Sequence, residues 1–269
     1  MSGPSLLSIV DVSVRFGGLL ALDSVSLSVE SEEIVGVIGP NGAGKTTLFN
    51  VACGFVAPTS GHLEIGERAV RRLRPNRLVS LGISRTLQGV GLWPGMSVLE
   101  NVMQGARASR GNNLVTSLLG LGWASRSEMR LRQRAIDLLG ELRMADVADQ
   151  APGSLPYALQ KRTSIARALI SEPRLLLLDE PASGLSGAEM DELAQLLEVW
   201  RGRMGILLVE HHMDLVMSVC QRLVVLDFGR VIATGDPESV QADPVVTKAY
   251  LGEDVAALEA SGRLGMSDA

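Results

Sequence analysis

The segment from Gly39 to Thr46 constrains the fold of this 269-residue chain more than any other. It reads GPNGAGKT and matches the pattern G-x-x-x-x-G-K-[ST] at every fixed position. The apolar run Ile34–Ile38 precedes it and predicts a buried strand. Residues Lys45–Cys53 follow and predict a helix that stops at Gly54. A strand, a glycine-rich turn and a helix in this order are typical of a loop that binds phosphate groups.

The residue types of this loop explain the expected chemistry. Gly42 and Gly44 let the backbone curl so that successive N–H groups point toward phosphate oxygens, and the following helix adds its positive end. Lys45 is expected to reach the β- and γ-phosphates of ATP, and the Thr46 hydroxyl to bind Mg²⁺. The predicted nucleotide-binding residues of the loop are Gly39, Pro40, Asn41, Gly42, Ala43, Gly44, Lys45, Thr46 and Thr47.

A second motif places two acids at the end of another apolar strand. Leu175–Leu178 is followed by Asp179 and Glu180. In a parallel sheet, ligands gather outside the carboxyl ends of the strands, so both acids are expected to face the nucleotide. Asp179 suits the Mg²⁺ shell, and Glu180 suits the role of base for the attacking water. Two acids can also end a strand merely for solubility, but the phosphate-binding loop makes that alternative weak.

The remaining pattern predicts an α/β fold: a P-loop NTPase core with a mostly parallel sheet, a small antiparallel β part and an inserted helical subdomain. Residues 7–30 alternate apolar and polar side chains and predict a hairpin. Further strand signal surrounds Gly61–Ile65, and core strands are predicted at Leu175–Leu178, Ile206–Val209 and Leu223–Leu226.

The middle third has helical rather than strand periodicity. Ser97 and Glu100 fit a capping box that opens a helix. Residues 105–127 are rich in Gly, Ser and Asn and predict a loose connection, after which Ser125 and Glu128 form a second possible cap. The predicted parts are residues 1–89 (antiparallel β part and first half of the nucleotide-binding core), 90–160 (helical subdomain), 161–235 (second half of the core) and 236–269 (C-terminal helix and tail).

Composition excludes several classes of protein. The net charge is −5, which argues against a nucleic-acid-binding protein, and the basic cluster from Arg68 to Arg77 is interpreted as a solvated surface. No apolar run approaches the length of about 18–20 residues that a membrane-spanning helix needs. Cys53 and Cys220 lack metal-binding or redox spacing and are expected in the core. We therefore expect a cytoplasmic chain whose link to a membrane comes through a partner.

Three further features resemble the ATPases of ABC transporters over nearly the whole chain. Gln88 follows a strand-like stretch, Ile83–Leu87, where that family has a glutamine that contacts Mg²⁺. Residues 155–169, LPYALQKRTSIARAL, occupy the place of the family signature. His211 follows the strand Ile206–Val209, where the family has a switch histidine that contacts the γ-phosphate. Phe16 lies where an aromatic residue usually stacks on adenine, with a simple core position as the alternative.

The signature departs from the family pattern. The usual Leu-Ser-Gly-Gly-Gln segment, which caps the ATP bound by the opposite subunit, corresponds here to Leu155–Leu159. Pro156 has neither hydroxyl nor N–H, and Ala158 adds a methyl group where glycine permits close approach. Ser186 stands where an aspartate is common. The residues predicted to face the partner's ATP are Pro156, Tyr157, Ala158, Leu159 and Gln160.

Several runs are more closely similar to the ATPases of branched-chain amino-acid importers, and in particular to the longer of their two ATPases. These runs are Gly82–Gln88, Leu92–Val102, Glu210–Met217 and Asp243–Gly252. The resemblance implies a peripheral protein on the cytoplasmic side of the plasma membrane. Its implied partners are a second ATPase subunit (a different chain or a second copy), permease subunits and, indirectly, a solute-binding protein. Two alternatives stay open: a weakly hydrolysing regulatory subunit, or an ATPase serving urea or other amides.

Overall fold

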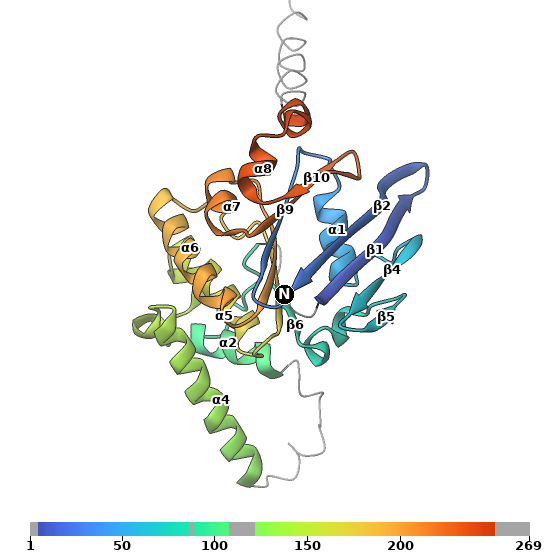
Figure 1. The fold of residues 1–269 in the computed structure, drawn as a ribbon. Coiled ribbons are helices and arrows are strands. Elements are labelled where there is room, and N and C mark those ends of the chain that lie inside the picture. Colours follow the sequence, from blue (N-terminus) through green and yellow to red (C-terminus); the bar gives the residue numbers. More distant parts are fainter. Residues whose placement is uncertain (1–4, 87–88, 108–121, 251–269) are drawn as a thin grey trace, which may run out of the picture.

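Two β-sheets with a helix between them form the framework of the protein (Figure 1). The computed structural model describes residues 5–86, 89–107 and 122–250. One sheet has four strands in the order β2-β1-β4-β5, and the other has six in the order β10-β9-β3-β8-β7-β6. The strands are β1 Ser5–Phe16, β2 Leu19–Glu30, β3 Ile34–Ile38, β4 Ser60–Ile65, β5 Arg68–Val70, β6 Ile83–Arg85, β7 Leu175–Asp179, β8 Gly205–Val209, β9 Arg222–Asp227 and β10 Arg230–Gly235.

The six-stranded sheet is parallel except at one edge. β3 pairs in parallel with β8 and β9, and β7 pairs in parallel with β6 and β8. Only β10 runs antiparallel, joined to β9 by the tight turn around Phe228. The four-stranded sheet is antiparallel throughout. The predicted α/β fold with a mostly parallel sheet and a small antiparallel part is confirmed.

The helices are distributed over the two faces of the larger sheet. Because side chains alternate along a strand, Leu175 and Leu177 pack in a core with α1 and the antiparallel sheet, whereas Leu176 and Leu178 pack against the other helices. The helices are α1 Lys45–Ala52, α2 Val98–Arg107, α4 Gly122–Glu141, α5 Tyr157–Leu169, α6 Gly187–Arg201, α7 Met213–Val219 and α8 Pro237–Gln241. None of the described helices is long and apolar enough to cross a membrane.

The helical part begins as predicted but continues differently. The N–H of Glu100 donates to Ser97 Oγ (3.2 Å) and the N–H of Ser97 to Glu100 Oε2 (2.8 Å), so the capping box before α2 is confirmed. The prediction of a second cap at Ser125 and Glu128 was wrong, because α4 begins at Gly122. The predicted loose connection is likewise too long at both ends, since α2 reaches Arg107 and α4 begins at Gly122. In α2, Ala106 still packs in the core with the apolar residues before it, which favours helix over loop there. Residues 108–121 lie outside the described structure.

The arm formed by α2 and α4 joins the core through α5 (Figure 1). The predicted boundary at residue 160 falls inside α5, which is continuous from Tyr157 to Leu169, and the four-part division stays a prediction. At the other end, α8 is followed by helical residues 244–250. The tail 251–269 lies outside the described residues.

Candidate active site at the strand ends

The predicted site residues emerge at one edge of the larger sheet. β8 lies between β3 and β7, and Val209 is in register with both Val37 and Asp179. The loop after β3, the acids at the end of β7 and the Glu210-His211 pair after β8 therefore leave neighbouring strands at the same level. This edge, at the carboxyl ends of parallel strands, is where ligands bind in such sheets.

The glycine-rich loop presents the open end of a helix. α1 begins at Lys45, and Gly44 before it has a φ of 103°, which favours glycine. A side chain there would also place its Cβ atom 2.8 Å from the carbonyl oxygen of Ala21. The N–H of Gly229 donates to the Ala43 carbonyl (2.9 Å), so the turn between β9 and β10 supports the loop from behind. No side chain caps α1, which leaves its N-terminal N–H groups for an anion.

Lys45 lies folded onto its own loop. Its side chain is buried, and Nζ donates to the carbonyl oxygens of Gly39 (2.5 Å) and Pro40 (2.8 Å). Thr46 is exposed and Thr47 half-buried at the start of the same helix. The ammonium group is thus held within the loop, at the level where the helix begins.

Asp179 lies in a crowded acidic environment. Burial, together with the charges of Glu180 and Glu210, raises its pKa to about 6, while Arg85 on β6 opposes the shift. Arg85 stacks its guanidinium 4.2 Å above the centre of the Phe55 ring. A partly buried carboxylate with two acidic neighbours is a favourable place for a divalent cation, because a cation relieves the repulsion.

Glu180 and His211 lie opposite each other with both side chains open to solvent. Glu180 Oε1 is 3.9 Å from His211 Nδ1, and the two side chains are 44% and 51% exposed. Glu180 has a φ of 47°, a conformation that is costly for a residue with a side chain. Its N–H donates to the carbonyl of Val209 (2.8 Å), so β8 supports the strained residue. The acid and the histidine therefore face solvent side by side at the sheet edge.

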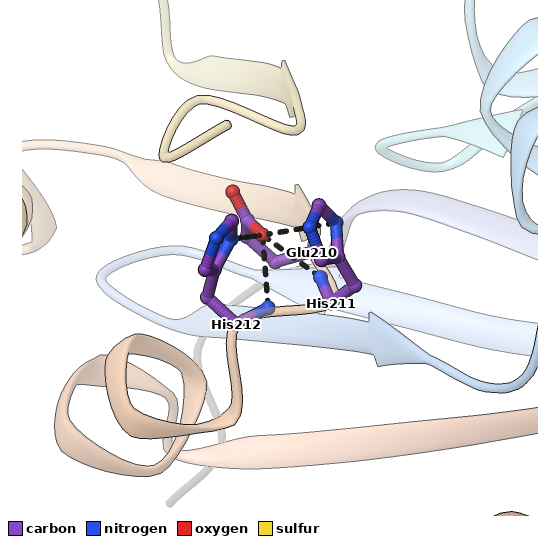
Figure 2. Close-up of side chains that lie close together, drawn as sticks. All are labelled: Glu210, His211 and His212. Atoms are coloured by element: carbon purple, nitrogen blue, oxygen red, sulfur yellow. Dashed lines mark hydrogen bonds and ion pairs between the residues drawn. The ribbon is translucent and has the colours of Figure 1, made fainter. Parts of the chain in front are cut away.

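Glu210 is a further site residue, and its role could not be predicted from the sequence (Figure 2). The side chain is fully buried; Oε1 accepts from the N–H of Ala182 (2.7 Å), and Oε2 accepts from the N–H groups of His211 (2.8 Å) and His212 (3.1 Å) and from His212 Nδ1 (2.9 Å). Burial raises the pKa of Glu210, but these hydrogen bonds outweigh burial and lower it. The one clue to this role in the sequence is that Glu210 is an acid directly after the apolar strand that ends at Val209.

Glu210, His211 and His212 also offer ligand atoms that lie within 4.8 Å of one another, close enough for a metal ion. However, Oε2 already accepts three N–H groups, which an ion would have to displace. The arrangement fits a structural carboxylate better than a metal ligand.

The remaining predicted residues lie at the margins. Phe16 ends β1 and is 51% exposed, so it is not a core residue. Gln88 lies outside the described residues. Pro156 directly precedes α5 without a capping side chain, and both it and Tyr157 are exposed. Leu159 and Gln160 are half-buried, whereas Ala158 is only 8% exposed, so its methyl group packs inside the chain.

Ser186 has a structural role at the start of α6. Its hydroxyl donates to Glu189 Oε2 (2.7 Å), and its N–H donates to the same oxygen (2.8 Å). These bonds complete a capping box, which explains why a serine is suited to this position.

Known proteins resemble this chain in sequence and in fold. Residues 22–183 match the family model described as ABC transporter, and residues 230–256 match the model described as branched-chain amino acid ATP-binding cassette transporter. The chain is 39% identical to the high-affinity branched-chain amino acid transport ATP-binding protein BraF of Pseudomonas aeruginosa, over 94% of this chain and all of BraF. It is 38% identical to the corresponding protein LivG of Escherichia coli K12, with the same coverage.

A solved ATP-binding cassette of an ABC transporter, in its ADP conformation, superposes with a TM-score of 0.81 at 29% identity, covering 93% of this chain and 99% of that one. Both resemblances inferred from the sequence are confirmed by these matches. The chain therefore belongs to the ABC transporter family, as one of its ATP-hydrolysing subunits.

Proposed function

We propose that this chain is an ATPase subunit of an importer for branched-chain amino acids. The observation that carries the proposal is the convergence of the glycine-rich loop, Asp179, Glu180 and His211 at one sheet edge. The assignment of solute rests on the similarity to BraF and LivG and on the C-terminal match at residues 230–256.

The proposed mechanism uses charge and positioning more than covalent chemistry. Lys45 exchanges its two carbonyl partners for oxygens of the β- and γ-phosphates. His211 donates to the γ-phosphate, and Glu180 beside it orients the attacking water and takes its proton. Phe16, exposed at the end of β1, stacks on the adenine ring.

The donor set also fits Mg²⁺. The exposed Thr46 hydroxyl and the Asp179 carboxylate supply oxygen ligands, which Mg²⁺ prefers, and Gln88 is proposed as a third. When bound, the ion neutralises phosphate charge and relieves the repulsion among Asp179, Glu180 and Glu210. Asp179 and Thr46 would thus hold the ion, which leaves the carboxylate of Glu180 for the water.

The proposed assembly contains a second ATPase subunit and permease subunits on the cytoplasmic side of the membrane. The signature residues at the start of α5 face the ATP bound by the partner, and Pro156 offers that phosphate no hydroxyl or N–H. Permease helices dock near residues 88–93, where Trp93 is 47% exposed. The departure at Pro156 favours a second candidate, a subunit that hydrolyses its own ATP but supports the partner's site weakly.

ATP turnover and solute uptake test the proposal. The purified chain is assayed alone and with cognate permease and ATPase subunits in liposomes, with leucine and urea as alternative solutes. We expect low turnover alone, higher turnover in the complex, and leucine uptake that Glu180→Gln reduces at least tenfold. Full turnover with Glu180→Gln contradicts the ATPase role, and uptake of urea but not leucine contradicts the solute. A rise in turnover at the partner's site with Pro156→Ser supports the second candidate.

A further inference from the structure

Two buried charges bracket the short segment that carries the proposed catalytic acid. Glu210, at the end of β8, holds the N–H of Ala182 (2.7 Å). Lys161, in the second turn of α5, is only 9% exposed, and its Nζ donates to the carbonyl oxygens of Glu180 (2.9 Å) and Pro181 (3.0 Å). Three consecutive residues, 180–182, are thus bound through their backbones to side chains from two different elements.

The backbone of Glu180 needs such support. Its φ of 47° is strained for a residue with a side chain, and strain of this kind persists only where the surroundings enforce it. The N–H of Glu180 is held by β8 through the Val209 carbonyl, and its carbonyl oxygen is held by α5 through Lys161. The direction in which the carboxylate points therefore depends on both neighbours.

Burying a lysine is costly, and here the cost is offset by local partners. Burial lowers the pKa of Lys161, and the charges of Glu210 and Glu180 partly restore it. The two carbonyl oxygens accept hydrogen bonds that a neutral apolar side chain would leave unmade. Lys161 is therefore matched to this position by charge as well as by geometry.

The start of α5 touches the same segment a second time. Gly184 has a φ of 77°, and a Cβ atom there would come within 3.0 Å of Tyr157 Cε1. Lys161 Nζ lies 5.5 Å from the centre of the Tyr157 ring. The end of α5 that carries the signature thus packs directly against residues 180–184.

On the other side, Glu210 binds the histidine pair. Its Oε2 accepts the N–H groups of both His211 and His212, as Figure 2 shows. One carboxylate therefore joins the segment after Glu180, through Oε1, to the loop of the switch histidine, through Oε2.

We infer that Lys161 and Glu210 are positioning residues. Together they fix the signature helix α5, Glu180 and His211 relative to one another, so that these three parts move together. The inference rests on the proposed function, in which the start of α5 faces the ATP bound by the partner subunit, whereas Glu180 and His211 face the ATP bound by this chain. Movement of α5 at one ATP site changes the placement of Glu180 at the other. Loss of either residue leaves ATP binding intact and slows hydrolysis.

The test uses the assembled transporter with one ATP site active at a time. In the first background the partner ATPase lacks its own catalytic acid, so turnover reports this chain's site. In the second, this chain carries Glu180→Gln, so turnover reports the partner's site. Lys161→Met removes the two hydrogen bonds, whereas Lys161→Arg retains a hydrogen-bond donor. The matched control is Arg162→Met, because Arg162 lies on the same helix but pairs with Glu192 on α6.

We expect Lys161→Met to lower kcat at least tenfold in both backgrounds with KM for ATP within twofold, and Lys161→Arg to recover most of the loss. In the first background, Glu210→Gln is likewise expected to lower kcat at least tenfold and to leave KM for ATP within twofold. An effect in one background only, or one no larger than that of Arg162→Met, overturns the inference. If Lys161→Met does not assemble, Lys161→Gln, which retains one donor group, is measured against the same limits. If Glu180→Gln itself leaves turnover unchanged in the first-background assay, the proposed function fails instead.

Discussion

At the scale of single residues, the acids at the ends of β7 and β8 have opposite electrostatic surroundings. Glu210 is surrounded by N–H donors, which favour its charged form. Asp179 has two acidic neighbours and partial burial, which disfavour its charge. A cation would relieve this repulsion, but by itself the residue proposed to hold Mg²⁺ lowers the stability of the protein.

Asp179→Asn is expected to stabilise the nucleotide-free protein at neutral pH. The pKa of Asp179 is raised from 3.8 to about 6, so the folded state binds the proton more tightly than the unfolded state. Stability attributable to this group is present below about pH 4 and is lost as the pH rises to about 6. After allowance for partial exposure, the variant should gain about 1–2 kcal/mol over the natural chain at pH 7.5, and less at pH 5.

Denaturant unfolding at both pH values measures this difference. Asp227→Asn, at the end of β9 on the same sheet edge, is the matched control for removing a carboxylate. If Asp179→Asn is less stable than the natural chain at pH 7.5, the charged form of Asp179 does not destabilise the folded protein, and the prediction is wrong.

The two cysteines are expected to be unreactive in the folded protein. Cys53 and Cys220 are buried, and burial raises the pKa of each thiol to about 12. Because the thiolate is the nucleophile, alkylation by iodoacetamide at pH 7.5 should be slower than in the denatured chain by a factor of about 100 or more. Mass spectrometry after timed alkylation measures this ratio, and rapid modification of either cysteine without denaturant would show that its helix end opens readily.

At the scale of elements, the contact between α2 and α5 depends on one glycine. A Cβ atom at Gly105 would come within 1.8 Å of the Arg167 carbonyl oxygen, so the two helices approach backbone to backbone. Arg167 in turn donates to the carbonyl of Gly91 (2.7 Å) and lies 5.1 Å from the centre of the Trp93 ring. The contact thus connects the signature helix to the surface proposed for the permease.

Gly105→Ala is expected to destabilise the protein by about 1–3 kcal/mol, because the added methyl group forces α2 away from α5. Gly140→Ala, on α4, is the matched control: its Cβ meets no described atom within 4 Å, and alanine favours a helix by up to about 1 kcal/mol. Thermal unfolding of both variants measures the difference. Equal stability of the two variants would mean that the close approach at Gly105 does not exist.

At the scale of the whole molecule, one apolar core runs from the helical arm into the larger sheet. It includes Leu131 and Leu139 of α4, Ile165 of α5 and Leu176 of β7. A continuous core couples the parts that the sequence analysis separated at residues 90 and 160. The arm and the sheet are therefore expected to depend on each other for stability.

Calorimetry of the nucleotide-free chain is expected to show one unfolding transition, with van't Hoff and calorimetric enthalpies in agreement. The physical reason is that exposing α4 alone would open the core that also covers the sheet. Two separated transitions would contradict this expectation and would support the predicted helical subdomain as an independent unit.

Some parts of the protein follow from local chemistry and can be predicted from a short stretch of the chain. The glycine-rich loop, the buried strand before Asp179 and the capping box at Ser97 each depend on neighbouring residues, so each was predictable from a short window. The start of α4 was predicted wrongly, because the helix already includes Ser125 and begins at Gly122, ahead of the cap that the local pattern suggests.

Contacts between residues that are distant in the sequence depend on how the whole chain folds. Lys161 meets the carbonyl of Glu180 across 19 positions, and Glu210 meets the N–H of Ala182 across 28. Nothing in the sequence distinguishes Lys161 from an exposed lysine on a helix, because its burial arises from the packing of α5 against residues 180–184. The physical reason is that hydrogen bonding to a buried backbone group depends on where the chain passes in space, and that path is set by the sheet as a whole.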